Sequence, residues 1–321
     1  MAKLIIGTLP FGGVISEIES ARIVNYAWEN DHRAFDVATL YGNGSAAEIL
    51  ARSLGERKLA SEIWVSIGLE RVPDPKGVFS VKVQKLTPRY IRESIDEMLR
   101  RLEIDKISVL NIHGPDPSTP FKETLEELLQ FKESGKIGKV AVSNFTPTEL
   151  DNLLAVDNQF GGGLDIFQMH GNMLEQRLIH EFKSTLEEKG KEIYCYRPFA
   201  RGLLTRNYSR NNPKPVDSRS TRGWRLDSYL TEDLLGELET LNNLISDYQY
   251  NPIHVSLYWL LSVSGVNGAI TGIRTLEQLQ DLIAFNSFIP SIAFKDQLEE
   301  FLANPIFSNY SGMLPKEYFE K

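Results

Sequence analysis

Two short runs of this sequence end in side chains that can move protons. The run FDVATLYG contains Asp36 and Tyr41, and the run VLNIHGPD contains His113. Both runs are apolar and rich in β-branched residues before the polar residues appear, as in a buried strand that leads into a loop. Carboxyl, phenol and imidazole groups can exchange a proton with a carbonyl oxygen. The three residues therefore predict an acid–base site for carbonyl chemistry.

A regular alternation of strands and helices must position these side chains. Eight short, mostly apolar segments are predicted as parallel strands covered on both sides. They are Lys3–Thr8, Ala34–Ala38, Ile63–Leu69, Ile107–His113, Lys139–Ser143, Ile166–His170, Glu192–Tyr196 and Gly268–Gly272. Amphipathic segments lie between them, such as Ile91–Leu102, which follows a suitable N-cap and first helical residue in Thr87 and Pro88.

This pattern predicts an α/β fold, a (β/α)8 TIM barrel forming a single domain over residues 1–321 with a long loop after the seventh strand. A doubly wound sheet is the alternative, but no Gly-x-Gly-x-x-Gly follows the first strand. Active sites of such barrels lie at the carboxyl ends of the strands, where Asp36, Tyr41 and His113 are expected to meet.

Each of these three residues also has an ordinary structural explanation. A strand-end Asp often caps a turn, a Tyr usually packs, and a single His is commonly a structural imidazole. Their joint position favours the functional interpretation. No spacing of Cys, His, Asp or Glu resembles a metal site, so no metal is expected. Cys195 gives no reason to expect a thiol nucleophile.

Composition limits the class of partner. The net charge of −8 argues against nucleic acid and against an anionic membrane surface, which usually require a basic protein surface. The chain has one cysteine, no secretory leader and no apolar run of about 18 residues. A cytoplasmic protein that acts on a small molecule is expected, while the oligomeric state is not predicted.

The segment from Arg197 to Tyr229 breaks the alternation. It is rich in Arg, Asn, Pro and Ser and shows neither helical nor strand periodicity. A loop of this length is usually functional or disordered. One interpretation is a solvated insertion. The other is a cover over the carboxyl ends of the strands, in which case Trp224 contacts the substrate and Tyr229 is a further candidate.

Seven motifs lie in order at the predicted strand ends: GTLPFGG, FDVATLYG, VLNIHGPD, VAVSNFTPTEL, FQMHGN, YRPFARGLLT and ITGIRTLEQL. Together they resemble the aldo-keto reductase family, and the resemblance runs from Gly7 to about Ala284. It implies a (β/α)8 barrel that binds a nicotinamide dinucleotide in extended form, usually NADP(H). It also implies that Asp36, Tyr41 and His113 match three members of the family's catalytic tetrad, with Tyr41 as general acid and His113 orienting the carbonyl.

The resemblance assigns cofactor residues as well. Ser143 and Asn144 would hold the nicotinamide carboxamide, Gln168 would be its third contact, and Tyr196 would stack on the nicotinamide ring. The amino-terminal motif adds Gly7 and Thr8 to this set.

The last motif would contact the adenosine end of the cofactor. Arg274 suits a 2′-phosphate because a guanidinium fork matches its oxygens. Thr275 can add its hydroxyl and the following helix N-terminus, and Gln278 completes the set. Leu282 stands where the family has a helpful Asn, which is a small departure.

The third predicted strand, within IWVSIGLE, departs from the family, which ends it in Thr-Lys. Alignment puts either Ser66 or Ile67 at the lysine position. A phenol titrates near pH 10, and a nearby ammonium lowers that pKa whereas a carboxylate raises it. Without the lysine, Asp36 is expected to raise the pKa of Tyr41. Three lysines of the following loop are alternative sources of the charge: Lys76, Lys82 and Lys85.

Three functions remain open from the sequence. The first is an NADP(H)-dependent oxidoreductase for a small carbonyl or sugar-like substrate, in which His113, held cationic by Asp36, serves as the acid. The second is a catalytically weak or inactive nucleotide-binding barrel that acts as a regulatory or partner subunit. The third is a lyase or epimerase that retains the nicotinamide. The polar loop after the seventh strand favours a polar or phosphorylated substrate, and hence an enzyme.

Overall fold

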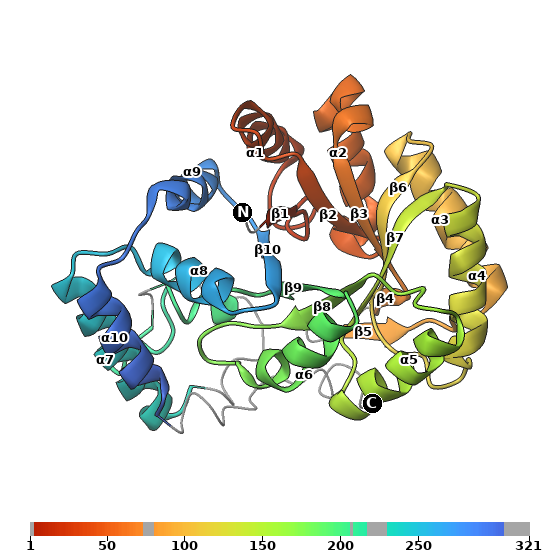
Figure 1. The fold of residues 1–321 in the computed structure, drawn as a ribbon. Helices are drawn as coiled ribbons and strands as arrows, with labels where there is room; N and C mark the ends of the chain where they lie inside the picture. The colour runs from red at the N-terminus through yellow and green to blue at the C-terminus, as the bar shows by residue number, and fades with distance from the viewer. Residues whose placement is uncertain (1–2, 73–79, 206–207, 217–229, 305–321) are drawn as a thin grey trace.

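A closed barrel of eight parallel strands forms the centre of the computed structural model, which describes residues 3–72, 80–205, 208–216 and 230–304 (Figure 1). The strands follow one another around the barrel in chain order, and the last pairs with the first. They are β1 (Lys3–Gly7), β2 (Ala34–Ala38), β3 (Glu62–Ile67), β6 (Ile107–Ile112), β7 (Ile137–Ser143), β8 (Ile166–His170), β9 (Glu192–Tyr196) and β10 (Val266–Gly272). The predicted (β/α)8 TIM barrel is thus confirmed.

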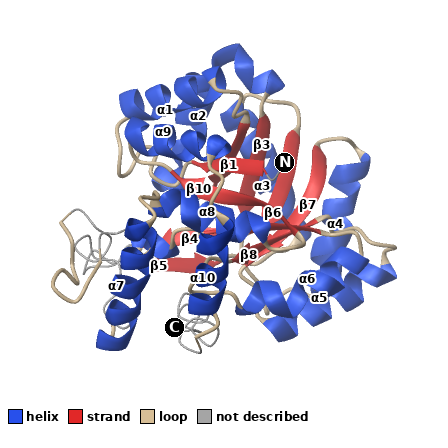
Figure 2. Cartoon of the chain, turned by 60° about the vertical axis from the view of Figure 1, so that its left-hand side comes forward, coloured by secondary structure: helices blue, strands red, loops and turns tan. Residues whose placement is uncertain are grey.

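Helices surround the barrel (Figure 2). Those of the strand–helix repeat are α1 (Glu17–Glu29), α2 (Ala46–Leu54), α3 (Pro88–Leu102), α4 (Phe121–Glu133), α5 (Pro147–Gln159), α6 (Arg177–Glu188), α8 (Pro252–Ser262) and α9 (Leu276–Ala284). In α3, Thr87 is the N-cap and accepts the backbone N–H of Tyr90, and Pro88 opens the helix, as the sequence predicts.

Alternate residues of the strands point into the barrel and fill it in layers. One apolar layer takes one residue from each strand: Ile5, Ala34, Trp64, Val109, Ala141, Ile166, Tyr194 and Ile270. Because strand side chains alternate, the residue two positions later in each strand also faces the interior. These residues form the next layer toward the carboxyl ends: Gly7, Asp36, Ser66, Asn111, Ser143, Gln168, Tyr196 and Gly272. The upper layer is mostly polar, so the apolar plug ends where the candidate site begins.

A second apolar cluster lies beside the barrel. Its helices include α7 (Glu232–Asp247) and α10 (Ile292–Leu302), which lie on one side of the molecule in both ribbon views (Figures 1 and 2). We call it the lateral core. Its buried members are Met173, Leu174, Ala200, Leu203, Leu204, Tyr208, Leu234, Leu235, Leu238, Leu241, Ile245, Val255, Phe294, Leu298 and Leu302. The segment that follows β9 is therefore anchored on these helices.

The stretch after β3 is not the simple loop that the sequence predicts. It contains an antiparallel pair, β4 (Leu69–Val72) and β5 (Ser80–Val83), in which Glu70 lies opposite Lys82. Strands of four residues carry too little periodicity to be recognised from sequence. Lys82 and Lys85 are exposed, so neither supplies a charge to the barrel interior, and Lys76 lies outside the described residues.

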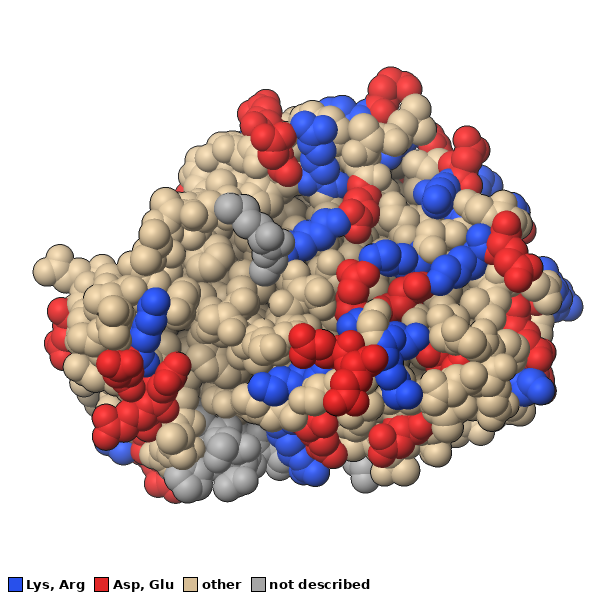
Figure 3. Space-filling view, in the orientation of Figure 1, with Lys and Arg blue, Asp and Glu red and all other residues tan. Residues whose placement is uncertain are grey.

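The outer surface mixes charges of both signs. On the face shown in Figure 3, acidic and basic side chains are interspersed rather than segregated. Several form helix-surface pairs one turn apart, such as Arg89 with Glu93 on α3. Within the described ranges, none of the helices has the length and apolar composition required to span a bilayer.

Candidate active site

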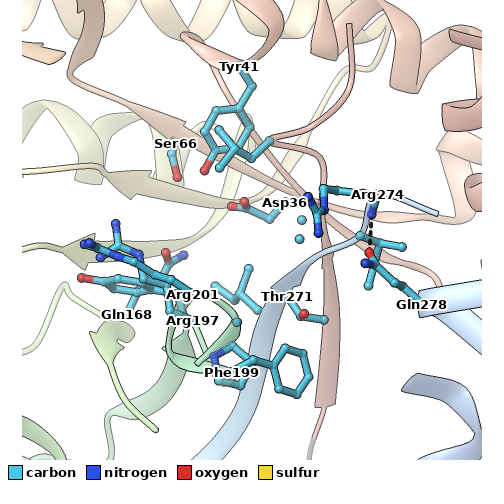
Figure 4. Close-up of a pocket in the computed structure, with 18 of the residues that line it drawn as sticks. Asp36, Tyr41, Ser66, Gln168, Arg197, Phe199, Arg201, Thr271, Arg274 and Gln278 are labelled. Carbon is cyan, nitrogen blue, oxygen red and sulfur yellow. Dashed lines mark hydrogen bonds between the residues drawn. The ribbon is translucent and has the colours of Figure 1, made fainter. Parts of the chain in front are cut away.

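The carboxyl ends of the strands enclose a cavity of about 510 Å³ (Figure 4). Its floor is the upper inward layer described above, and its walls come from the segments after β2, β9 and β10 and from the β4–β5 hairpin. Ten predicted site residues line it: Gly7, Asp36, Tyr41, His113, Ser143, Asn144, Gln168, Tyr196, Arg274 and Gln278. Residues far apart in the sequence therefore meet at one site.

Two further predicted residues among the described ones, Thr8 and Thr275, do not line the cavity. Thr8 is buried beside it and donates from its hydroxyl to the backbone carbonyl of Asp36 at 2.9 Å. Thr275 is the N-cap of α9. Trp224, predicted to contact substrate, lies outside the described residues, as does Tyr229.

Asp36, which is buried, and Tyr41, which is half-buried, form a hydrogen-bonded pair. Tyr41 opens a short turn in which Gly42 has φ 58°, and a Cβ at that position would lie 2.8 Å from the Ser45 hydroxyl, so glycine is required. The Tyr41 hydroxyl donates to the Asp36 carboxylate. Burial raises the pKa of Asp36 to about 7, against the lowering effect of that hydrogen bond.

The pKa of Tyr41 is raised well above 10. Burial is the main cause and the Asp36 carboxylate adds to it, whereas the Arg197 guanidinium opposes the rise. The phenol is therefore protonated at neutral pH. The effect expected of Asp36 is present, but burial contributes more to the rise.

His113 follows β6 and is neutral in this site. Its ring meets that of Tyr41 edge-on, with centroids 6.1 Å apart, and its backbone N–H donates to Ile67 at 2.8 Å. Burial lowers the pKa of His113 to about 4, and the charge of Arg197 lowers it further. The expectation that Asp36 holds His113 cationic is thus wrong, because burial outweighs any attraction to a carboxyl that is itself half protonated near pH 7. The buried Nδ1 has no hydrogen-bond partner.

The end of β3 resolves the choice between Ser66 and Ile67. Ser66 lines the cavity, whereas Ile67 points the other way into the apolar core between the strands and the helices. Asn111 bridges the floor by donating from Nδ2 to the hydroxyls of Ser66 at 2.9 Å and Ser143 at 3.0 Å. The described lining residues include three arginines, Arg197, Arg201 and Arg274, and no lysine.

Asn144 connects two of the predicted functional residues. It has a left-handed backbone, φ 64°, which Asn tolerates better than most residues. Its Nδ2 donates to the His113 carbonyl at 2.6 Å, and its Oδ1 accepts from the Tyr196 hydroxyl at 2.6 Å. The amide thereby fixes the end of β6 relative to the end of β9.

Behind Tyr196 lies a buried group to which the sequence assigned no role. The His170 ring stacks on the Tyr196 ring at 5.2 Å with an interplanar angle of 7°. His170 Nε2 lies 2.9 Å from Glu175 Oε2, which also accepts from Asn172 Nδ2 at 2.8 Å. All three of these residues are buried. They hold the Tyr196 ring in place from the side of β8.

The cavity suits a nicotinamide carboxamide. Gln168 Nε2 is buried and has no hydrogen-bond partner among the described residues, so it is a donor available to a carbonyl oxygen. The side chains of Ser143 and Asn144 lie in the same wall, and Tyr196 offers an aromatic surface next to them. Asn144 Nδ2 already donates to the His113 carbonyl and the Ser143 hydroxyl to the Ile112 carbonyl, so Gln168 Nε2 is the available donor. Together with the flat Tyr196 ring it fits the carboxamide oxygen and the ring of a nicotinamide.

The start of α9 differs from the predicted phosphate site in one respect. The backbone N–H of Arg274 donates to Gln278 Oε1 at 3.0 Å, and that of Gln278 donates to the Thr275 hydroxyl. The N–H of Leu276 donates to the Glu19 carboxylate at 3.1 Å. These helix N-terminal donors are therefore already engaged, and an anion here would depend chiefly on the Arg274 side chain.

The segment after β9 supplies residues that sequence reasoning did not assign to the site. Arg197, Phe199, Arg201 and Tyr208 line the cavity, and Arg201 is buried. Arg197 and Arg201 both have φ 59°, an uncommon backbone for non-glycine residues that often marks functional sites. The dense Arg content of the YRPFARG motif was the one available signal.

Comparison with known proteins identifies relatives over nearly the whole chain. The model of the "Aldo/keto reductase family" matches residues 3–302. Among curated proteins, the L-glyceraldehyde 3-phosphate reductase of Escherichia coli K12 is 28% identical over 306 residues, covering 91% of this chain and 86% of that protein. The human aldo-keto reductase family 7 member A3 is 25% identical and covers 87% of each chain.

Solved structures confirm the fold. A glycerol dehydrogenase from Gluconobacter oxydans superposes with a TM-score of 0.78 at 24% identity, covering 94% of this chain and 91% of that one. At this level of identity the likeness establishes the barrel architecture.

Proposed function

The chain belongs to the aldo/keto reductase family, and from this we propose that it is an NADP(H)-dependent oxidoreductase that acts on a small carbonyl or sugar-like substrate. The observation that supports the proposal most is the single cavity in which Tyr41 and His113 face the carboxamide-binding group centred on Gln168. The proposed proton donor Tyr41, the orienting group His113 and the proposed cofactor contacts thus line the same cavity.

A bound nicotinamide dinucleotide would exchange a hydride with the carbonyl carbon. In the reductive direction Tyr41 donates its hydroxyl proton to the carbonyl oxygen. The neutral His113 donates a hydrogen bond to the same oxygen and orients it. Asp36, with a pKa of about 7, is partly protonated at neutral pH and can return a proton to the Tyr41 oxygen. This return of a proton from Asp36 is one part of the atypical proton handling that we propose for a site without a lysine beside Tyr41.

Cofactor preference depends on two opposing side chains at the start of α9. Arg274 lines the cavity and offers a guanidinium to a 2′-phosphate, while the Glu19 carboxylate at the same helix end repels it. We expect Arg274→Ala to weaken NADPH binding far more than NADH binding. Glu19→Gln should shift the preference further toward NADPH. Equal changes for both cofactors in fluorescence titrations would contradict the NADP(H) assignment.

The substrate class follows from the polarity of the cavity. Many apolar residues line the cavity, among them Leu40, Leu69 and Ile273, but its charged groups are three arginines and the Asp36 carboxyl. We take the arginines to favour a small carbonyl compound that also carries polar or anionic groups. The Escherichia coli relative is named for a sugar-phosphate aldehyde, which agrees with this class.

A second candidate is a nucleotide-binding subunit with little activity, favoured by Ser66 at the lysine position. One sample distinguishes the two: titrate NADPH by fluorescence, then screen aldehydes, ketones and sugars for NADPH oxidation. Turnover that is lost in Tyr41→Phe while NADPH binding is retained would support the oxidoreductase. Tight binding with no turnover on any of them would favour the subunit.

A further inference from the structure

The proton donor Tyr41 is half-buried in the cavity, and no lysine occupies the strand-three position beside it. Ser66 and Asn111 occupy that part of the floor with neutral groups. A protonated phenol that loses its proton during reaction requires a nearby positive charge to stabilise the phenolate. The question is which side chain of this chain supplies that charge.

Arg197 is placed to do so. It directly follows β9 and lines the same cavity as Tyr41 and His113, and its guanidinium carbon lies 5.6 Å from the centroid of the Tyr196 ring. Figure 4 shows Arg197 and Arg201 on the side of the cavity that holds Gln168, opposite Arg274. Arg274 lies on the side of Gln278, at the start of α9.

The backbone of Arg197 is held in an uncommon conformation. At φ 59° its carbonyl accepts from the Ala200 N–H at 3.0 Å and from Asn172 Nδ2 at 3.1 Å. Asn172 is fully buried and also holds Glu175. A left-handed residue that is fixed by a buried amide has a defined side-chain direction, and here that direction is into the cavity.

The charged and titratable groups around Tyr41 come from three sides. Asp36 faces it from β2, His113 from the end of β6, and Tyr196 and Arg197 from the end of β9. Of these, Arg197 alone is cationic at neutral pH, and its charge acts on both Tyr41 and His113.

We propose that Arg197 replaces the missing strand-three lysine: its guanidinium stabilises the negative charge that develops on the Tyr41 oxygen as the proton leaves for the substrate. The charge approaches the phenol from β9 instead of from β3. Arg197 thus acts through Tyr41. The inference rests on the proposed oxidoreductase function and names the residue that makes its proton transfer feasible.

The test uses the full chain with NADPH bound, because Arg197 lies near the ring on which the nicotinamide is proposed to stack. Arg197→Met removes the charge and keeps a flexible, unbranched side chain, and Arg197→Lys keeps the charge. The double variant Arg197→Met with Ser66→Lys restores a cation from the other side. Steady-state NADPH oxidation is measured against pH, and NADPH affinity is measured by fluorescence.

We expect Arg197→Met to lower kcat about 100-fold, within the usual range for positioned acid–base catalysis. The alkaline limb of its pH–rate profile should move to higher pH, because the phenol pKa rises when the cation is removed. Arg197→Lys should retain most activity, and the double variant should recover much of the loss. A loss confined to KM or to NADPH affinity, with an unchanged pH profile, would show that Arg197 only holds an anionic group. Absence of recovery in a folded, NADPH-binding double variant would also overturn the proposal.

A measurement that does not require enzymatic turnover tests this inference independently of the proposed function. Because the Arg197 charge lowers the pKa of His113, that pKa, followed by NMR of the labelled imidazole, should rise in Arg197→Met and fall again in the double variant. An unchanged His113 titration would refute the inference even in an active enzyme. A wild-type protein inert toward every carbonyl would refute the function while leaving this measurement intact.

Discussion

Replacing Asp36 with Asn should change how the stability of the protein depends on pH. The carboxyl titrates near 3.8 when solvated and near 7 in the folded chain, where it is 5% exposed. The folded state therefore keeps a proton through this window that the unfolded state has lost. The stability from this group is full below about pH 3.8 and is lost as the pH rises through about 7.

The two pKa values give the size of the effect. Between about pH 5 and about pH 8 the buried carboxyl lowers the free energy of unfolding by about 3 kcal/mol, since each pKa unit is worth about 1.4 kcal/mol. Asn has the shape of the neutral carboxyl and does not titrate. Relative to wild type, the Asp36→Asn variant should therefore gain about 3 kcal/mol in unfolding free energy when the pH is raised from about 5 to about 8.

Urea unfolding at both pH values measures this difference directly. Asp151→Asn, at an exposed position on α5, is the matched control and should show the same difference from wild type at both pH values. Parallel pH dependence of Asp36→Asn and wild type would refute the claim that burial raises the pKa of this carboxyl.

Three other changes test the barrel and its site. Ser66→Lys should fold and raise turnover on an activated aldehyde, whereas Ile67→Lys buries an unpaired charge and should cost about 4 kcal/mol in urea unfolding; equal stability of the two would contradict the assigned register. Gly268→Ala should destabilise the protein by about 2 kcal/mol, because the new Cβ would clash with the Lys3 backbone carbonyl and lie 2.7 Å from the Tyr194 ring, and an unchanged melting temperature would argue against this close approach. Cys195 is buried, and burial raises its pKa, so a thiol reagent should label it only after unfolding; rapid labelling of the native protein would disagree.

The barrel was predictable because its signal is repeated. Each strand is short, apolar and flanked by amphipathic helices, so an error of one or two residues at a strand end leaves the alternation intact. The same error is decisive at a single side chain, because a shift by one residue moves it to the other face of the sheet. This is why the sequence left Ser66 and Ile67 as alternatives until Trp64, two residues earlier, was found in the inward layer.

Some polar residues of the cavity could be predicted from the sequence and others could not. Asp36, Ser143, Gln168 and Tyr196 could be predicted because motif and strand end coincide. Arg197 was not assigned individually, because the sequence places it at the start of a long polar segment that has no periodicity, and its left-handed backbone could not be foreseen. Nor could His113 be predicted as neutral, since its pKa depends on how completely the folded chain excludes water from it.

The lateral core is an apolar cluster separate from the main core, and it supports one wall of the cavity. All of its buried members lie between residues 173 and 302, and Ala200, Leu203, Leu204 and Tyr208 tie the segment after β9 to α7 and α10. Proteins open locally in such contiguous units, without unfolding as a whole. An excursion of this unit would uncover one side of the cavity while the strands stay paired. The residence time of a bound molecule would then be governed by leucine packing between α7 and α10, far from any group that performs chemistry.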